Sequence, residues 1–347
     1  MQLFFLAVGD RVRASSRLRL WDHVDSFRNP GDTVIADFVV PSSETRLSLR
    51  LMFRIFLKLP GWVAAFFRAD AIYIQESLIL AWLLPARNLF KRRLVVFDFS
   101  DPIDMIGSGL SNRLRRAAFR RMTRLADHIV FENGAYFADF HDRFSSVSQF
   151  CGPVDARRYA EARKVARGIS QHQRSGPLVL GWTGSPSTLN LIEPLFPLLD
   201  QIARVRSISL VLIGVSQTRF RFEHLAVNAM LWSEDSEFAT VPLFDLGLFG
   251  LDDSKKSQRR GAGKLFIYMA AGVPFIAPCR GIAGDLMQLT GVGFGVRDEA
   301  EWERCLLQAI DDNVERQRCS TEGMRIAEDQ YSYEKFRSEL GRQLRVG

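Results

Sequence analysis

The feature that most constrains the fold is an alternation of short apolar runs with longer amphipathic stretches, which occurs in both halves of the chain. In the first half, the runs are residues 3–8, 34–40, 71–74, 94–97 and 128–131. In the second half, they are residues 178–182, 209–213, 244–248, 274–277 and 294–296. Runs of this length are typical of buried strands, and the stretches between them have the spacing of helices. The alternation therefore favours parallel sheets covered by helices.

The length and the repeated pattern predict two domains. A chain of 347 residues is long enough to bury two cores. Residues 164–177 are polar and lack periodicity, which is typical of a linker. We therefore expect an α/β fold with two Rossmann-like, doubly wound domains that face each other across a cleft. The first is expected to span residues 1–165 and the second residues 172–330, while a helix at 331–347 packs back on the first.

The net charge of +7 and the pI near 9.5 predict an anionic partner. An acidic lipid or a phosphorylated small molecule fits this charge. Nucleic acid does not, because aromatic and basic residues are not interleaved as a base-stacking groove requires. The four cysteines lack the spacing of a zinc site, so we expect no metal. No apolar run approaches the roughly 20 residues of a membrane-spanning helix, and we expect a cytoplasmic protein.

One segment of the second half has the features of an anion-binding site. Residues 244–278 contain a short strand, a basic loop, a helix and a second strand. Gly261 and Gly263 precede or open the helix, where they let backbone amides approach an anion. Arg260 and Lys264 add positive charge that would neutralise a diphosphate. A solvated basic turn before an amphipathic helix is the alternative interpretation.

A second candidate contact lies in the turn after the strand that ends at Trp182. Gly184 and Ser185 open the following helix, so their backbone and hydroxyl groups could contact a phosphate or a ribose. Equally, Ser187 or Thr188 would serve as a simple helix N-cap. A glycine at position 184 is also what a tight strand-to-helix turn requires without any ligand.

Several segments, taken in chain order, resemble glycosyltransferase family 4, whose members have the GT-B fold. They are residues 14–19 (ASSRLR), 181–185 (GWTGS), 244–248 (FDLGL) and 264–274 (KLFIYMAAGVP), with weaker similarity at 95–101 and 330–333. The resemblance implies a hexosyltransferase-like enzyme that takes a sugar from a nucleotide-diphosphate donor with retention of configuration. It also implies donor binding in the second domain, acceptor binding in the first, and no metal or other cofactor.

The resemblance assigns residues to each substrate. The donor-binding residues are Gly184, Ser185, Arg260, Gly261, Gly263, Lys264, Tyr268 and Asp285. One departure concerns two glutamates, eight positions apart, that many family members carry. Arg259 and Ile267 occupy these positions here, and a frame shifted by one gives Arg260 and Tyr268. Asp285 is the candidate to take over part of their role, although an aspartate is favourable near a helix N-terminus in any case.

This departure keeps two other functions open. One is a non-catalytic protein that binds or scaffolds sugar nucleotides on the same fold. The other is a sugar-nucleotide epimerase, which can share the architecture.

The first domain supplies the expected acceptor-binding residues. Arg13, Ser16 and Arg17 follow the first strand, and Asp98 and Asp101 end a later one. The bases and the serine would attract an acidic or pyrophosphate-bearing acceptor. Asp101 is the candidate catalytic carboxylate, because a carboxylate there could orient the attacking hydroxyl. Exposed helix positions for the bases and helix capping for the aspartates are the alternatives.

A basic stripe in the first domain predicts contact with a membrane. Arg46, Arg50, Arg54 and Lys58 recur at four-residue spacing beside a wide apolar arc, and Trp62 follows. A helix of this kind is typical of the surface of an anionic bilayer. The alternative is a core helix with a solvated rim. A second basic helix at 113–124 has a narrower apolar side and is expected to dock on the domain. Together they favour a peripheral membrane enzyme acting on a lipid-linked or surface-polysaccharide acceptor.

Overall fold

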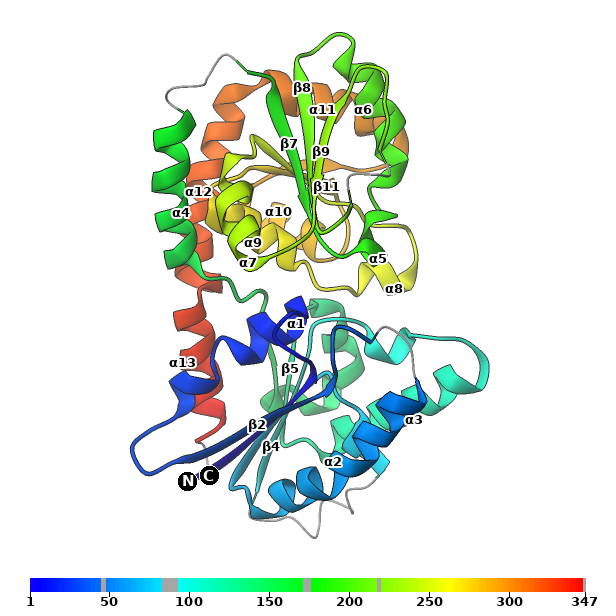
Figure 1. The fold of residues 1–347 in the computed structure, drawn as a ribbon, viewed down its shortest axis with the longest axis vertical. Helices are drawn as coiled ribbons and strands as arrows, with labels where there is room; N and C mark the ends of the chain where they lie inside the picture. Colours follow the sequence, from blue (N-terminus) through cyan, green and yellow to red (C-terminus); the bar gives the residue numbers. More distant parts are fainter. Residues whose placement is uncertain (45–47, 83–92, 171–175, 217–219, 346–347) are drawn as a thin grey trace. The chain divides into compact units, whose positions relative to one another are not determined.

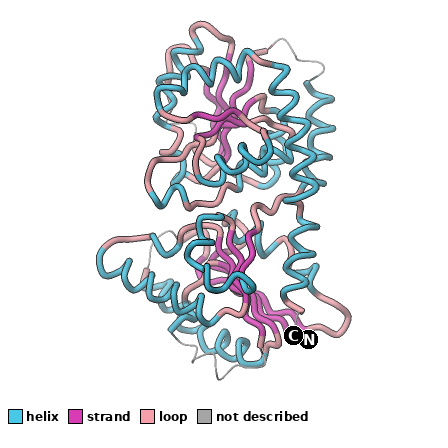
Figure 2. The backbone as a smooth tube through the Cα atoms, turned by 180° about the vertical axis from the view of Figure 1, so that it is seen from behind, coloured by secondary structure: helices cyan, strands magenta, loops and turns pink. Residues whose placement is uncertain are grey.

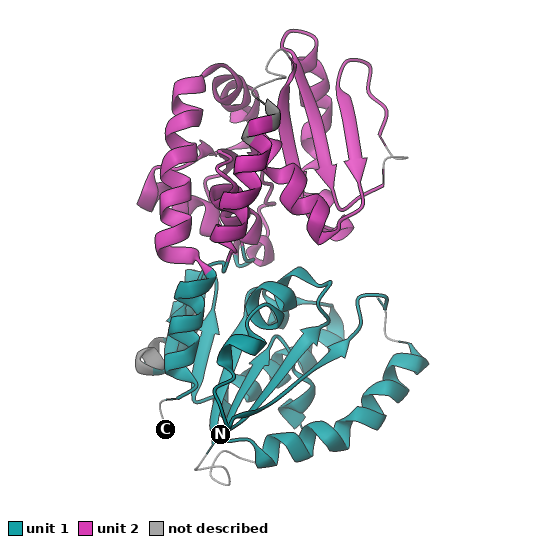
Figure 3. Ribbon diagram, turned by 60° about the vertical axis from the view of Figure 1, so that its left-hand side comes forward, with its two compact units in different colours: residues 1–153, 259–261, 333–347 teal, residues 154–258, 262–332 magenta. Residues whose placement is uncertain are grey.

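The structure is a computed structural model of the chain (Figure 1), and it describes all residues except 45–47, 83–92, 171–175, 217–219 and 346–347. It divides into two compact units, each with a six-stranded sheet. In each unit the strands lie inside and the helices outside (Figure 2). Unit 1 comprises residues 1–153, 259–261 and 333–347, and unit 2 comprises residues 154–258 and 262–332 (Figure 3).

The sheet of unit 1 is parallel throughout, with strand order β2-β1-β3-β4-β5-β6. Its strands are β1 (Gln2–Gly9), β2 (Thr33–Val40), β3 (Ala71–Gln75), β4 (Leu94–Phe99), β5 (His128–Phe131) and β6 (Val147–Gln149). The central strands are buried on both faces, which explains why they are apolar runs rather than alternating ones. The expected parallel α/β sheet is confirmed.

Two helices cover one face of this sheet, α2 (Leu49–Arg68) and α3 (Gly109–Leu125). The other face is covered by α13 (Tyr333–Gln343) and by two short turns, η1 (Arg17–Trp21) and η2 (Val24–Phe27). The remaining short elements of unit 1 are α1 (Ala14–Ser16), η3 (Ile79–Trp82), η5 (Ile103–Met105) and η6 (Gly134–Ser146). Helix α2 begins where Ser48 Oγ accepts a hydrogen bond from Leu51 N at 3.0 Å, as N-cap serines do.

The sheet of unit 2 is also parallel, with strand order β12-β11-β10-β7-β8-β9. Its strands are β7 (Leu178–Thr183), β8 (Ile208–Ile213), β9 (Ala226–Met230), β10 (Leu246–Leu248), β11 (Phe275–Pro278) and β12 (Phe294–Val296). This is the order of a Rossmann domain. Strands β7 and β10 are neighbours. From β7 the chain continues to β8 toward one edge of the sheet, and from β10 it continues to β11 toward the other edge.

Helices surround this second sheet. They are α4 (Ala156–Ser170), α5 (Pro186–Leu189), α6 (Phe196–Ala203), α7 (Glu234–Thr240), α8 (Lys255–Gln258), α9 (Gly263–Ala271), α10 (Gly281–Thr290), α11 (Trp302–Asp311) and α12 (Asn313–Tyr331), with short turns η7 (Glu193–Leu195), η9 (Val241–Leu243) and η10 (Glu299–Glu301). From Leu265 to its last residue, α9 is buried. It stops at Gly272, whose φ of 68° is the left-handed conformation of a helix C-cap.

The division of the chain differs from the expected boundary between residues 165 and 172. Residues from Val154 onward belong to unit 2, because α4 packs against α9 and α12. The last helix, α13, belongs to unit 1, where Phe336 and Leu340 join the core. The chain therefore enters unit 2 and returns from it within extended segments around Val154 and Ser332, which pair as a parallel bridge.

Candidate functional site

Each sheet has one point at which neighbouring strands send the chain in opposite directions. Ligands of doubly wound domains bind at such switch points, beyond the carboxyl ends of the strands. In unit 1 the point lies between β1 and β3, and in unit 2 it lies between β7 and β10. These two places are the candidate sites.

In unit 2, Gly184 and Lys264 come together at the end of β7. Gly184 N donates a hydrogen bond to Ile213 O at 3.0 Å. A Cβ atom on Gly184 would lie 2.6 Å from Lys264 Cε and 2.6 Å from the ring of Trp182. Lys264 Nζ lies 5.6 Å from the centroid of that ring, within the range of a cation–π contact. A side chain at position 184 would therefore displace the lysine.

The N-terminus of α9 lies beside this lysine. Ala262 occupies the N-cap position without a side-chain cap, and the first turn contains no acidic residue. At Gly263 the position of a Cβ atom is open, with no heavy atom within 4 Å. The amides of the first turn and the helix dipole add to the positive charge of Lys264. Gly263, Lys264 and Gly184 thus form a basic, glycine-lined end of the sheet.

Ser185 and Asp285 are exposed, and neither is fixed by the core. Ser185 Oγ shares a hydrogen bond of 2.9 Å with Ser187 Oγ. Asp285 lies on α10, and desolvation raises the pKa of its carboxyl. Their side chains are accessible to a ligand of unit 2.

Tyr268 has a different place from the one its expected donor-binding role requires. It is buried, and its hydroxyl donates to Leu248 O at 3.2 Å and accepts from Thr183 N at 3.3 Å. Burial raises the pKa of this hydroxyl. The ring packs against Gly247, so Tyr268 joins β7, β10 and α9 from inside the core.

Two of the four residues expected to bind the diphosphate, Arg260 and Gly261, belong to unit 1. Arg260 Nε lies 4.0 Å from Asp101 Oδ1, and Arg260 O accepts from Asn133 Nδ2 at 3.1 Å. A Cβ atom on Gly261 would lie 2.9 Å from the carboxylate of Glu132. The acidic residues of unit 1 attract this basic loop, whereas Gly263 and Lys264 belong to unit 2, so the expected diphosphate-binding residues are divided between the two units.

In unit 1, a compact hydrogen-bond network joins the ends of β1, β3 and β4. Ser16 Oγ donates to Gln75 Oε1 at 2.8 Å and accepts from Gly9 N at 3.0 Å. Ser15 Oγ donates to Glu76 Oε2 at 3.1 Å. The sequence identified Ser16, but it did not identify Gln75, the last residue of β3, or Glu76, which follows it.

Glu76 is the centre of this network. Its Oε1 accepts from Ser100 Oγ at 2.6 Å and from Ser100 N at 3.1 Å. Among the described residues it alone combines a side chain with a positive φ, 54°. Such a conformation is costly outside glycine and is concentrated at functional sites. The available sequence signal was a carboxylate placed directly after an apolar strand, in the run Tyr-Ile-Gln-Glu-Ser.

Asp98, expected to bind the acceptor, is instead an internal anchor. It is fully buried, accepts from Arg19 Nε at 2.8 Å, and also accepts from the hydroxyl of Tyr73. Burial raises the pKa of its carboxyl, and Arg19 opposes that rise. Asp98 does not reach a substrate, because β4 continues to Phe99 and Asp98 lies within the sheet beside Gln75 of β3.

The remaining expected residues of unit 1 differ in exposure. Arg17 is buried, whereas Arg13 is exposed and its stem packs beside Gly9. Asp101 is accessible and lies beside Arg260. Within the described residues, two buried donors of this region, Arg19 Nη2 and Gln75 Nε2, have no hydrogen-bond acceptor. Such groups are commonly satisfied by water or by a ligand.

The expected membrane helix is present as α2, but its sides are assigned differently. Trp62 is only 3% exposed and its Nε1 donates to Asp37 Oδ2 at 2.8 Å. Lys58 Nζ lies 2.5 Å from Asp37 Oδ1. Trp62 therefore faces the core, which corrects its expected contact with a bilayer. Arg46 lies outside the described residues, and Arg50 is exposed.

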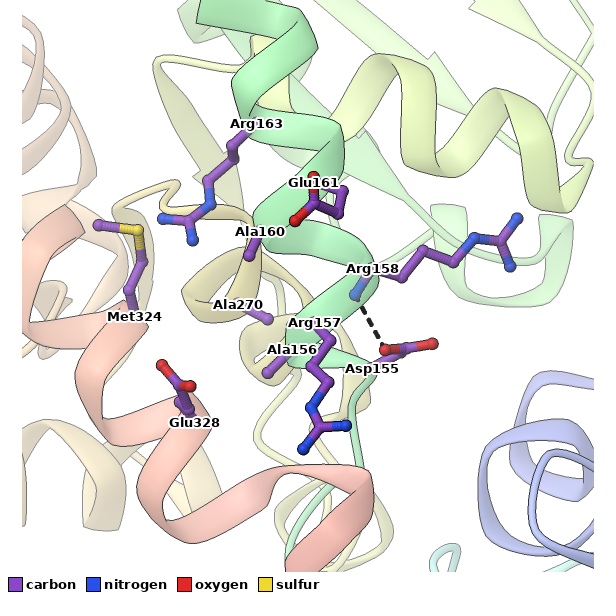
Figure 4. Close-up of a pocket in the computed structure, with 10 residues that line it drawn as sticks. All are labelled: Asp155, Ala156, Arg157, Arg158, Ala160, Glu161, Arg163, Ala270, Met324 and Glu328. Carbon is purple, nitrogen blue, oxygen red and sulfur yellow. Dashed lines mark hydrogen bonds between the residues drawn. The ribbon is translucent and has the colours of Figure 1, made fainter.

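A cavity of about 470 Å³ lies elsewhere in unit 2, among α4, α9 and α12 (Figure 4). Arg157, Arg163 and Glu328 line it together with Ala270 and Met324. Ala270 is near the C-terminal end of α9, whereas Lys264 is at the other end. The cavity mixes acidic and basic side chains and is separate from the switch point, so we assign the site to Gly184 and Lys264.

The described residues contain no group of three or more His, Cys, Asp and Glu side chains placed to hold a metal ion. Within the same residues, no helix is both long enough and apolar enough to cross a bilayer.

Solved structures share this architecture over their whole length. HepE from Anabaena in complex with UDP-glucose matches with a TM-score of 0.71 and 15% sequence identity, covering 99% of each chain. WaaG, a glycosyltransferase involved in lipopolysaccharide biosynthesis, matches with a TM-score of 0.68 and 14% identity over 100% of each chain. Sucrose-phosphate synthase from Thermosynechococcus elongatus has a TM-score of 0.67 and 12% identity, covering 99% of this chain and 98% of its own. No family model and no curated protein matches the sequence. The structural agreement confirms the predicted two-domain α/β fold.

Proposed function

We propose that this chain, which has the fold of the GT-B glycosyltransferases, transfers a sugar from a nucleotide-diphosphate sugar to an acceptor. The observation that carries the proposal is the basic, glycine-lined end of the unit 2 sheet, formed by Gly184, Gly263 and Lys264. A diphosphate fits the chemistry of this place. HepE, which has the same fold, was solved with UDP-glucose bound.

Unit 2 would bind the donor and stabilise the leaving group. Gly184 leaves room for the stem of Lys264, and the open position at Gly263 lets a phosphate approach the free amides at the start of α9. Lys264 would neutralise charge that develops as the nucleotide leaves. Because the ammonium and the helix dipole supply positive charge, we propose a reaction that needs no metal and no further cofactor. Ser185 and Asp285 are the accessible side chains for the ribose or the base.

Unit 1 would bind the acceptor. Glu76 is held by Ser15 and Ser100 in a fixed, costly conformation at the switch point, so we propose that it orients the attacking hydroxyl. The exposed Arg13 would contact an acidic or pyrophosphate group. We further propose a lipid-linked or cell-surface glycan as acceptor, transfer of a hexose with retention, and a place at the cytoplasmic face of a membrane.

A protein that binds sugar nucleotides without turnover is the second candidate function. It is favoured by the residues found at the two positions where many enzymes of this type carry a pair of glutamates. Here Arg259 pairs with Asp139 at 2.5 Å, and Ile267 is buried. Neither position offers a carboxylate to a sugar. An epimerase on the same fold would release free nucleotide and an inverted sugar from the donor alone.

A thermal-shift screen of the full chain against nucleoside diphosphates and their sugars tests the proposal. A specific donor at about 100 times its Kd would stabilise the fold by about 2.7 kcal/mol. The donor that stabilises the chain is then incubated, in labelled form, with the protein and membrane glycolipid extracts. Transfer supports the enzyme, whereas stabilisation without transfer or hydrolysis selects the binding protein. Failure of every nucleotide to stabilise the chain would overturn both.

A further inference from the structure

The outward side of α2 is a row of apolar side chains. We define the α2 apolar row as Leu49, Met52, Phe53, Phe56 and Leu57. Phe53 is 64% exposed and Phe56 is 70% exposed, whereas the opposite side of the helix packs on the sheet. A surface helix normally turns its polar side to water. An exposed apolar row of this kind marks a surface that another partner covers.

Basic residues flank this row on α2 itself. Arg54 lies over the ring of Phe38 at 4.6 Å, and Lys58 lies over the same ring at 5.1 Å. These contacts place the two bases on the side of the helix that faces β2. Arg50 and Arg68 are exposed and form no ion pair with any described residue. The helix contains no acidic residue.

Helix α3 extends the basic surface. Its exposed side carries Arg113, Arg116, Arg120 and Arg124, together with the exposed Leu110 and Leu114. It too contains no acidic residue. The four arginines form no ion pair within the described part of the chain. Their positive charge is therefore not neutralised by a neighbouring carboxylate.

The two helices present these sides in the same general direction. Phe66 of α2 and Phe119 and Met122 of α3 belong to one core cluster on one face of the unit 1 sheet. The helices lie on the same side of that sheet (Figure 1). Their outward sides therefore point away from the same face, with the apolar row on one helix and the arginines on the other.

We propose that this combined surface of α2 and α3 binds an anionic lipid bilayer. The α2 apolar row would enter the boundary between headgroups and acyl chains, and the arginines of α3 would contact lipid phosphates. This deepens the proposed function, and it rests on that function where a lipid-linked acceptor is concerned. It also differs from the sequence interpretation, since Trp62 and Lys58 are engaged with Asp37 and the inserted residues are phenylalanines and leucines.

A bilayer fits this surface better than a second copy of the chain. In a two-fold symmetric contact, each copy would set the same patch against its partner. The arginines of α3 would then meet like charges, without any acid on either helix to offset them. Anionic lipids supply the opposite charge along with an apolar phase.

Flotation with lipid vesicles tests the proposal on the full chain. Vesicles of phosphatidylcholine alone are compared with vesicles that also contain phosphatidylglycerol. The wild-type chain is expected to float with the anionic vesicles, and high salt should weaken that binding. The variant F53S/F56S/L57S should bind at least about tenfold more weakly, because it removes the inserted apolar area. The variant R113Q/R116Q/R120Q should lose about tenfold at low salt.

The variant L289S is the matched control, because Leu289 is 82% exposed on α10 of unit 2. It should float as the wild type does. Donor-induced thermal stabilisation of each variant separates loss of folding or of donor binding from loss of membrane binding. Absence of wild-type flotation, or wild-type flotation by F53S/F56S/L57S, would overturn the proposal. So would a wild-type dimer that fails to float and that F53S/F56S/L57S converts to a monomer.

Discussion

The two switch points are built in opposite ways. In unit 2, the open position at Gly263 leaves the start of α9 accessible, Gly184 makes room for the stem of Lys264, and Lys264 supplies charge. In unit 1, Glu76, Ser16 and Ser100 form a dense network above a buried ion pair. An accessible backbone suits a diphosphate, which carries its own charge and acceptors. A fixed network suits a neutral hydroxyl that must be oriented. Four experiments test whether the two switch points have these different roles.

Removing Arg19 should produce the largest effect, on the stability of unit 1. The variant R19M leaves Asp98 buried without its guanidinium partner, and loss of one partner of a buried pair costs about 3–5 kcal/mol. Urea unfolding measures the change. The exposed pair of Arg304 and Glu301 is the control, because R304M should cost at most about 1 kcal/mol.

The double variant R19M/D98N keeps this prediction testable if R19M does not fold. Neutralising Asp98 should restore part of the lost free energy, since the two residues act on one another. A cost of R19M as small as that of R304M would show that the network is not anchored by this pair.

Substituting Glu76 should act on transfer and not on donor binding. We expect E76Q to lower kcat about a hundredfold, because the amide cannot orient or accept a proton as the carboxylate does. The KM for the donor and the donor-induced thermal shift should stay near wild type. An equal loss of donor affinity would instead mean that Glu76 only maintains the fold.

Substituting Lys264 should have the complementary effect. Loss of a charged contact to the diphosphate should weaken donor affinity by about 1.5–3 kcal/mol in K264A. The variant G184A should weaken it too, because the added Cβ displaces the lysine. K164A is the matched control, since Lys164 is an exposed lysine of α4 paired with Glu161. Equal nucleotide affinity in K264A and K164A would remove the lysine from the site.

The smallest effect concerns acid and again belongs to unit 1. Burial lowers the pKa of His23 to about 3, while its Nδ1 accepts from Arg337 Nε at 3.1 Å. The unfolded chain, with a histidine pKa near 6.5, binds the proton more readily, so stability is present above pH 6.5 and falls as the pH drops toward 3. At pH 5 the loss relative to pH 7 should be about 2 kcal/mol.

Urea titrations of the wild type and of H23Q at the two pH values measure this loss. The glutamine variant should show a smaller difference between pH 7 and pH 5, because it has no group to protonate. An equal difference in the two proteins would assign the acid sensitivity to other residues.

Sequence reasoning located most of the secondary structure because apolar periodicity reports local burial. It found β1 to β5 in unit 1. In unit 2 it found β7, β8, β10, β11 and β12 and the helix that begins near Lys264. It did not identify Glu76, since a single carboxylate after a strand has no periodicity and its positive φ is set by the contacts of Ser15 and Ser100. It also placed Asp98 toward a substrate, because sequence does not fix strand register or the position of Arg19.

Two parallel α/β sheets and a basic turn at the start of α9 follow from the order of apolar runs, glycines and bases, because spacing along the chain controls local backbone and burial. Which side of α2 meets the sheet depends on tertiary packing, since apolar residues surround most of that helix and their spacing does not select the side on which Trp62 and Phe66 are buried. Packing also decided that Arg260 and Gly261 group with unit 1. The side chains that contact Arg260, those of Asp101 and Asn133, lie more than a hundred residues away in sequence, and such long-range pairing leaves no local pattern.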